Sequence, residues 1–372
     1  MKLKIKQNIL MEHLNYVIRG ISSKNLIPIL NCIKFELTNE GLYLMSTDNE
    51  ISIKSFICGK DIDEIDELGE VVISGRYIYD IVKKLPNEII NIEEVLDSKL
   101  LIYTNNSSFN LNCNKVNEFP NLEIELQKNP ICLEKCVFKN IISQTSFATS
   151  NQESRPVLTG INFKINGNLL ECTATDSYRL AKKTIEIEEV KNEINIIIPT
   201  KNLLELTRMI NDDEEKIEMH IFNNKVVFVF GNIIMLTRLI NGTYPDTSKL
   251  IPSTFSLDII SNFNNFYNSI DRASLLTNEA DKNTIKLQSN GNKVIISSNI
   301  PEIGNVEETL SVEKNSEEDI RIAFSSKYML DALKSFDSEN IQLLFNGEVK
   351  PIIVKNPDSD DLIQLILPIR TY

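Results

Sequence analysis

Glycine and histidine are scarce in this chain, and their scarcity limits the chemistry that it can carry out. Among 372 residues there are 12 glycines and two histidines, His13 and His220. The sequence has no Gly-rich phosphate loop, no HExxH and no GxSxG motif. Neither histidine has an evident nucleophile or partner near it in the sequence. We therefore expect a protein that is not an enzyme and that holds no cofactor.

The cysteine spacing gives no sign of a disulfide scaffold or of a metal site. The six cysteines include a single CxxxC pair, formed by Cys132 and Cys136. A structural zinc site needs four clustered ligands, and the two histidines lie far from this pair in the sequence. We expect reduced, buried thiols in a cytosolic protein. The cysteines are Cys32, Cys58, Cys113, Cys132, Cys136 and Cys172.

Long apolar runs are absent, although 42% of the residues are hydrophobic. No run approaches the roughly 18–20 residues that span a bilayer. The first residues, MKLKIKQNILMEHL, carry charges through what would have to be the apolar core of a signal peptide. We expect the N-terminus of a mature, cytoplasmic protein.

A basic excess is also missing, since the net charge is −13. Taken alone, this argues against nucleic acid as a partner. The acids run in blocks, however, such as DIDEIDELGE (61–70) and DDEEKIE (212–218). The net charge therefore says little about any one face of the molecule.

One pattern occurs three times in the chain, which is too long for a single ordinary core. VISGRYIYDIVKKL (72–85), IIPTKNLLELTRMI (197–210) and IAFSSKYMLDALKSF (322–336) each have a base, an acid four residues on and a second base at the seventh. On a helix these offsets fall within about 60° of one another, opposite the apolar positions. Each segment is predicted to be an amphipathic helix with a basic outer face. The helix bases are Arg76, Lys83, Lys201, Arg208, Lys327 and Lys334.

Further repeats support the same division. PILNCIKFEL (28–37) and PVLTGINFKI (156–165) share four residues at identical offsets, and both reach a Thr-Asp pair at the same distance. Helical patterns cover 8–21, 133–148 and 257–276, while alternating runs such as GLYLMST and SFNLNCN are typical of half-buried antiparallel strands. We predict an α+β chain of three units, each with two helices packed on an antiparallel sheet. The predicted units are 1–127, 128–252 and 253–372.

Five motifs, in this order along the chain, resemble the bacterial DNA sliding clamp family, the beta subunit of DNA polymerase III. They are IPIL (27–30), EFPNL (118–122), ATDSYRLA (174–181), NGTYPD (241–246) and LPIRTY (367–372). The resemblance covers the whole chain. It implies three clamp domains per chain and a head-to-tail homodimer that closes a ring of six domains, with helices lining the hole.

The same resemblance implies that duplex DNA passes through the ring. The helix bases would face the DNA without reading its sequence, and the acidic blocks would face outward. Weak phosphate contacts suffice because a closed ring is held by topology, while each contact adds only about 0.9 to the salt slope. Lys24 and Gln152 are implied to contact tilted DNA.

The segment that matches ATDSYRLA is implied to line an apolar cleft between the second and third domains. There the DNA polymerase III alpha subunit, the clamp loader and repair proteins would dock a short peptide on prolines and aliphatic side chains. Arg179 and Arg370 would supply charge-assisted hydrogen bonds. Tyr178 departs from the histidine expected there, which bears on pH sensitivity and on peptide preference. The cleft residues are Leu158, Thr175, Ser177, Tyr178, Arg179, Leu180, Pro245, Leu250, Val349, Pro351, Pro368, Ile369 and Arg370.

The implied dimer contact is apolar. Phe109 and Leu111, on an edge strand of the first domain, would meet Leu275 and Leu276 of the partner subunit. The region LLIYTNNSSFNLNCN (100–114) has no base to pair with Glu302, Glu307 and Glu308 on the matching acidic segment. Closure would therefore rest on apolar packing and strand pairing, and an unpaired edge would favour aggregation.

Two other functions are open on the residues alone. The chain could be a monomeric interaction hub that binds the peptide and never encircles DNA. It could also be an enzyme that uses Asp176, Ser177 and Tyr178, although no feature of the sequence suggests a substrate. A dimer retained on circular DNA would favour the clamp, a monomer that still binds peptide would favour the hub, and turnover abolished by Ser177→Ala would favour the enzyme.

Overall fold

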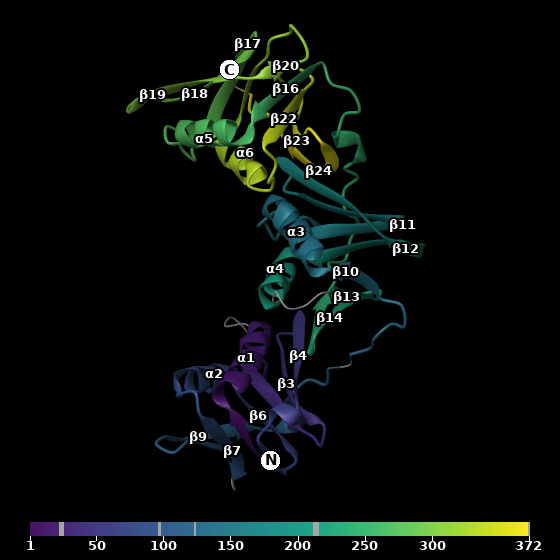
Figure 1. Ribbon diagram of the computed structural model, residues 1–372, viewed down its shortest axis with the longest axis vertical. Helices are drawn as coiled ribbons and strands as arrows, with labels where there is room; N and C mark the ends of the chain where they lie inside the picture. Colours follow the sequence, from purple (N-terminus) through teal and green to yellow (C-terminus); the bar gives the residue numbers. More distant parts are fainter. Residues whose placement is uncertain (22–25, 96–97, 123, 211–215, 371–372) are drawn as a thin grey trace. The chain divides into compact units, whose positions relative to one another are not determined.

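The computed structural model describes residues 1–372 apart from 22–25, 96–97, 123, 211–215 and 371–372. Its internal contacts divide the chain into two compact units, Met1–Cys136 with Asn202–Leu239 and Val137–Lys201 with Ile240–Tyr372. Figure 1 labels most of the helices and strands of each unit. Lys24 lies outside the described residues, as do the last two residues of LPIRTY.

One long antiparallel sheet forms the scaffold of the first unit, in the strand order β10-β13-β14-β15-β4-β3-β2-β6-β9-β8-β7-β1-β5. GLYLMST and SFNLNCN form strands with the predicted bounds. Inward residues such as Phe35 and Leu44 face each other across the β2–β3 register and are fully buried. The strands are β1 (Lys2–Lys6), β2 (Cys32–Leu37), β3 (Gly41–Thr47), β4 (Ile51–Cys58), β5 (Glu64–Glu67), β6 (Gly69–Ser74), β7 (Ile89–Val95), β8 (Lys99–Tyr103), β9 (Ser108–Asn114), β10 (Ile131–Glu134), β13 (Lys216–Ile221), β14 (Lys225–Phe230) and β15 (Ile233–Arg238).

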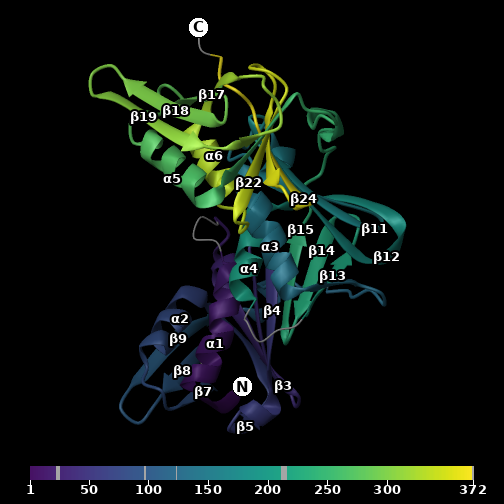
Figure 2. The same cartoon turned by 45° about the horizontal axis from the view of Figure 1, so that its top comes forward.

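Two helices of the first unit, α1 (Gln7–Val17) and α2 (Gly75–Lys84), lie side by side against this sheet (Figures 1 and 2). In α2 the buried Ile78 and Val82 are four residues apart, so they share one helix face. The bases of α2 lie on the exposed side. The helix ends before an extended Leu85, because Pro86 disfavours helical backbone in the residue before it.

The second unit contains a seven-stranded sheet, β11-β12-β24-β23-β22-β16-β20, and a four-stranded sheet, β19-β18-β17-β21. Helices α5 (Phe263–Ser274) and α6 (Ser326–Leu333) lie side by side and bury Phe266, Ile270 and Met329 in the core between these sheets. The strands are β11 (Gly160–Thr175), β12 (Arg179–Pro199), β16 (Leu257–Asn262), β17 (Thr284–Asn290), β18 (Lys293–Ile300), β19 (Gly304–Ser311), β20 (Glu313–Lys314), β21 (Arg321–Ser325), β22 (Asn340–Phe345), β23 (Ile352–Asn356) and β24 (Ser359–Ile366).

The predicted helices are shorter in the structure than in the sequence pattern. Helices α3 (Lys135–Thr145) and α4 (Thr200–Met209) span only part of 133–148 and 197–210. The predicted helix at 257–276 was wrong over its first six residues, which form β16. In α5 and α6 the start is fixed by a side-chain cap, since Asn262 accepts from the N–H of Asn265 and Ser325 from that of Tyr328.

The repeated Pro-x-Leu segments begin as 3₁₀ turns and not as strands. Pro28–Asn31 precedes β2 and Pro156–Thr159 precedes β11. Proline fits the first position of such a turn, because its φ is fixed and it has no N–H to leave unpaired. Each turn then buries its leucine, Leu30 or Leu158, which explains why this residue pair repeats.

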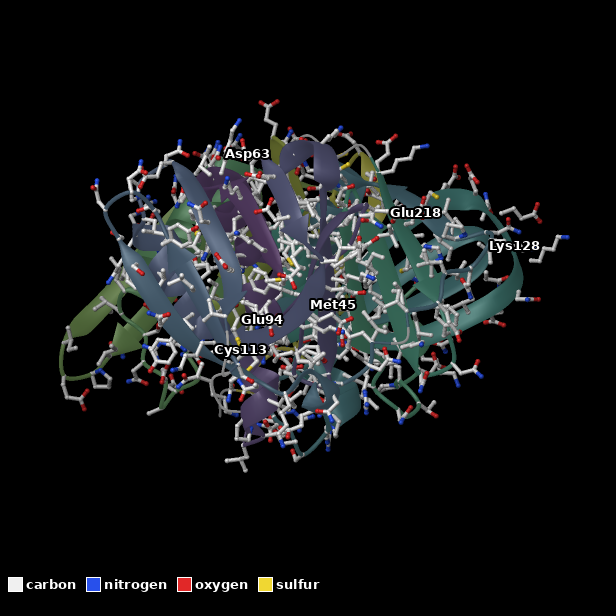
Figure 3. All side chains as sticks on the ribbon, turned by 90° about the horizontal axis from the view of Figure 1, so that it is seen from below. Met45, Asp63, Glu94, Cys113, Lys128 and Glu218 are labelled. Atoms are coloured by element: carbon white, nitrogen blue, oxygen red, sulfur yellow. The ribbon has the colours of Figure 1, made fainter. Side chains whose placement is uncertain are left out.

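The EFPNL motif has a packing role in the first unit. Phe119 is buried against Cys32, Met45 and Val72, with Leu122 packed at the margin. Figure 3 shows Met45 among the crowded side chains of the sheet, while Lys128, a few residues beyond the motif, projects at the margin. The segment after β9 therefore covers apolar side chains that the sheet would otherwise expose to water.

The structure has all six cysteines as thiols outside disulfides, but the expectation that all are buried was wrong. Cys32 and Cys172 are buried, whereas Cys132 and Cys136 are exposed at the start of the β10–α3 segment. Burial raises the pKa of the Cys172 thiol well above its ordinary value and that of Cys113 to about 11.

His13 gives the first unit a predicted acid sensitivity. Burial lowers its pKa to about 4, and its Nδ1 lies 2.6 Å from the Ser55 hydroxyl. The unfolded chain takes up a proton near pH 6.5 and the folded chain only near pH 4. The contribution of His13 to the free energy of unfolding is therefore fully present above pH 6.5. It is lost as the pH falls toward 4, by up to about 3 kcal/mol.

We expect His13→Gln to reduce this loss, because glutamine does not titrate and can still bond Ser55. Urea unfolding midpoints followed by circular dichroism between pH 7.5 and 4.5 measure the difference. Parallel pH profiles for the two proteins would show that His13 contributes nothing to the acid sensitivity.

Candidate functional site

The ATDSYRLA motif forms a tight turn between β11 and β12, and the same turn joins β3 to β4. The hydroxyl of Thr175 donates to the Arg179 carbonyl at 2.6 Å and accepts from the N–H of Ser177 at 3.1 Å. Asp176 Oδ1 accepts from the N–H groups of Tyr178 and Arg179 at 2.9 and 3.0 Å. The side chains of Thr175 and Asp176 therefore hydrogen-bond backbone groups of the turn itself.

The first copy of this turn has the same bonds. Thr47 donates to the Ile51 carbonyl and accepts from Asn49 N–H, while Asp48 accepts from Ile51 N–H at 2.9 Å. Asn49 and Ser177 have φ of 75° and 77°, so both copies place a non-glycine residue in the left-handed region. The repeated Thr-Asp pair is thus a turn-forming element, and Asp176 and Ser177 do not form a nucleophile and base.

Arg179 is held by charges and rings within the second unit. Its Nε lies 3.1 Å from Asp176 Oδ2 and its Nη1 2.6 Å from Asp331 Oδ2, and its side chain is 11% exposed. Its guanidinium carbon is 4.5 Å from the ring centroid of Tyr328 and 5.4 Å from that of Phe147. Arg179 therefore joins the turn to α6, and its charge is already paired.

The C-terminal segment runs beside the same turn. The N–H of Leu367 donates to the Tyr178 carbonyl at 2.9 Å, and that of Ile369 donates to the Ala323 carbonyl at 2.7 Å. The first bond continues the β12–β24 pairing past the end of β24, where Arg179 faces Ile366, and the second ties the segment to β21 of the four-stranded sheet. Two of the five motifs, ATDSYRLA and LPIRTY, are thereby brought together.

A hollow of about 550 Å³ lies next to the turn, and we call it the turn hollow. Tyr178 projects there, and its ring is stacked on that of Tyr328 with centroids 6.5 Å apart. Neither Tyr328 nor Arg155 was predicted, and the sequence signal for them was their position beside Lys327 and Pro156. The lining residues are Thr149, Ser150, Asn151, Gln152, Ser154, Arg155, Leu158, Asp176, Ser177, Tyr178, Arg179, Lys327 and Tyr328.

The cleft residues fall into buried and exposed groups. Leu158 packs in the core with Ile197 and Tyr244, and Leu180 with Leu344, Ile353 and Leu365. Val349 and Leu250 are 65% and 47% exposed, and Pro245 and Arg370 are also exposed. Pro351, Pro368 and Ile369 are half-buried. Ile369 and Arg370 line a second hollow, of about 590 Å³, against β17–β19.

The NGTYPD motif positions the segment that carries Pro245 and Leu250. Gly242 has φ of +136°, and a Cβ there would lie 2.6 Å from Val157, so only glycine fits. Tyr244 is then buried beside Leu158, and this burial, with the Asp176 charge nearby, raises the pKa of its phenol.

The helix bases are exposed, but the acid between each pair is used differently in the three copies. Arg76 Nε lies 3.9 Å from Asp80 on its own helix. Glu205 accepts from Arg208 at 2.5 Å and from Arg19, which follows α1, at 2.8 Å. In the third copy Asp331 pairs with Arg179, as described above. Among the described residues, Lys201, Lys327 and Lys334 have no ion pair within 4 Å.

Two of the predicted dimer residues lie on a sheet edge, and the other two follow a helix. Among the described residues, Ser108–Asn112 of β9 pair only with β8, so Phe109 and Leu111 lie on an edge strand there. Leu275, which follows α5, is 77% exposed, and Leu276 is half-buried. Strand β19 ends its sheet. Its Glu308 is paired with Arg272 at 2.6 Å, and Arg272 lowers the pKa of this carboxyl.

Comparisons with known proteins agree with the motifs. Three family models match the chain: the N-terminal domain of the DNA polymerase III beta subunit at residues 1–123, its central domain at 132–246 and its C-terminal domain at 248–370. The prediction of an α+β chain built from three clamp domains is confirmed by these matches. The boundaries 1–127, 128–252 and 253–372 stay a prediction, because the internal contacts group the chain differently.

Relatives match over their whole length. The beta sliding clamps of Staphylococcus epidermidis and Staphylococcus aureus are 41% and 40% identical to this chain, with all of each chain covered. The solved sliding clamp of Bacillus subtilis superimposes with a TM-score of 0.96 at 38% identity, again over all of both chains. The DNA polymerase III beta chain of Streptococcus pneumoniae gives 0.94 at 34%.

Within the ranges that the structure describes, no cluster of three or more histidine, cysteine or acidic side chains could hold a metal ion. In the same ranges, no helix is long and apolar enough to cross a bilayer.

Proposed function

Because the chain belongs to the DNA polymerase III beta subunit family, the beta sliding clamps, we propose that it is a non-catalytic processivity factor. Two copies close head to tail into a ring around duplex DNA in the cytoplasm. The ring tethers the DNA polymerase III alpha subunit, the clamp loader and other proteins that carry a clamp-binding peptide. The enzyme alternative loses its basis, because the bonds of Asp176 and Ser177 are those of a turn that occurs twice.

The cleft residues are proposed to bind the partner peptide. The observation that carries this is the hydrogen bond from Leu367 to the Tyr178 carbonyl, which keeps the C-terminal segment beside the turn. Exposed Tyr178, Leu250 and Val349 offer apolar contact, while the buried Leu158 and Leu180 support the floor from below. The paired Arg179 fixes the turn, so Arg370 is the one of the two predicted arginines that is proposed to bind the peptide.

The helix bases are proposed to contact DNA phosphates, together with Lys24 and Gln152. The exposure of the six helix bases, on α2, α4 and α6 or at the end of α6, supports this assignment for them. Lys327 lines the turn hollow, so we expect its contribution to DNA binding to be the smallest of the six.

Ring closure is proposed to join the free edge of β9 to β19 of the partner subunit. Phe109 and Leu111 would then pack against Leu275 and Leu276 of the partner subunit. The pairing of Glu308 with Arg272 supports a contact that rests on strand pairing and apolar packing, since this acid already has a base in its own chain.

We expect Arg76→Glu, Lys201→Glu and Arg208→Glu together to slow loading onto nicked circular DNA about tenfold or more while the protein stays dimeric. Each ring would carry six reversed charges against the phosphates. The matched control reverses the exposed Lys60, Lys128 and Lys191, which lie outside the α-helices and outside the strands proposed for ring closure, and it changes the net charge equally. Loading rates with the cognate clamp loader measure the effect, and equal rates for both variants would remove the basic helix faces from the proposal.

A further inference from the structure

Lys327 is the helix base that reaches the turn hollow. It is exposed on the first turn of α6, next to Tyr328, and both side chains line the hollow with Tyr178 and Ser177. Lys334, the second base of the same copy, follows the last turn of α6 and does not line this hollow. The base–acid–base pattern therefore places two similar lysines in different surroundings.

Asp331, the acid four residues after Lys327, pairs with another base. In the first copy the base and the acid four residues on, Arg76 and Asp80, lie 3.9 Å apart. In the third copy the equivalent acid, Asp331, lies 2.6 Å from Arg179 Nη1. Lys327 thus keeps its charge available to whatever occupies the hollow.

The remaining charges of the hollow favour an anionic occupant. Asp176, its acid, accepts two backbone N–H groups and Arg179 Nε, so its acceptor positions are used. Arg179 is offset by Asp176 and Asp331. Arg155 is exposed and donates to the Ser177 hydroxyl at a long 3.4 Å. Within the described part of the chain, Arg155 and Lys327 therefore provide the charge of the hollow that has no ion pair, and both line it with Tyr178.

We propose that Lys327 is a specificity-determining residue of the peptide cleft, which selects partner peptides that place a carboxylate beside Tyr178. This rests on the proposed function, since it refines the peptide site of that proposal. An ammonium on a flexible stem can follow a carboxylate in several peptide poses, so it discriminates by charge more than by geometry. We expect Lys327 to contact mainly bound peptides and Lys334 to contact DNA.

A display library of random dodecapeptides, selected on the full-length protein, tests the proposal. We expect peptides selected by the wild type to carry Asp or Glu at one recurrent position. Lys327→Glu should select Lys or Arg there, whereas Lys334→Glu, the matched control on the same helix, should select as the wild type does. Identical preferences for the wild type and Lys327→Glu would overturn the proposal.

Affinities for one selected peptide and its uncharged Gln or Asn version give the second measurement. By fluorescence anisotropy, Lys327→Gln should weaken the acidic peptide about fivefold and leave the uncharged version unchanged. Loading onto DNA should fall for Lys334→Glu and stay close to wild type for Lys327→Glu, and the reverse pattern would overturn the assignment. If Tyr178→Ala weakens the binding of none of the peptides that the wild type selects, the proposed peptide site is wrong. That outcome differs from a peptide site at which binding does not depend on charge.

Discussion

Replacing Arg179 by alanine is expected to lower the free energy of unfolding by about 2–4 kcal/mol. The change leaves Asp331 and Asp176 without their base and removes a guanidinium that packs on the rings of Tyr328 and Phe147. Breaking a desolvated ion pair from one side costs more than the pair contributes, because the partner charge stays behind. Urea unfolding followed by circular dichroism measures the loss.

Two further variants separate the contributions of Arg179. Arg179→Lys keeps the charge but loses the planar stacking and the second donor, so an intermediate loss is expected. Adding Asp331→Ala to Arg179→Ala should cost less than the two single losses together, because the stranded carboxylate is then absent. An unchanged unfolding midpoint for Arg179→Ala would show that the ion pair does not hold the turn to α6.

Deleting residues 367–372 is expected to abolish stimulation of the polymerase while leaving the dimer intact. The deletion removes the segment that donates to the Tyr178 and Ala323 carbonyls and takes away Pro368, Ile369 and Arg370. A few residues carry most of the binding free energy of an interface, and the deletion removes several residues of the proposed peptide site. Affinity for the polymerase should therefore fall about 30-fold or more.

Primer extension in the presence of the cognate polymerase measures this effect. Sedimentation of the same sample gives its mass, which should stay near twice 42.4 kDa. Full stimulation by the truncated protein would mean that the peptide binds elsewhere. A monomer would mean that the C-terminal segment is structural and that the loss of stimulation has another cause.

The sequence predicted well those features that depend on local spacing. The base–acid–base segments contain helices with exposed bases, and the alternating runs are strands, because helix and strand periods differ clearly. The sequence showed that the Thr-Asp pair repeats, but it did not show which structure the pair forms. Only the hydrogen bonds of Thr47 and Thr175 reveal one turn built twice.

Features that depend on long-range placement could not be predicted in this way. The spacing placed Asp331 four residues after Lys327 on one helix face, but it gave no sign that the fold brings Arg179, 152 residues away in sequence, within 2.6 Å of this acid. Glu308 was expected to find no base across the dimer contact, but the sequence did not reveal that Arg272 of the same chain pairs with it. Both ion pairs depend on which strand lies beside which helix, and a short sequence motif does not determine this.

Retention on a nicked circular plasmid tests the central claim most directly. The protein is assembled on the plasmid with the cognate clamp loader, placed in high salt, and followed by gel filtration before and after the plasmid is cut once. A closed ring should stay on the circle and leave the linear form, because topology and not phosphate contact retains it. Protein lost from both forms, with an active loader, would contradict ring closure and favour a monomeric interaction hub.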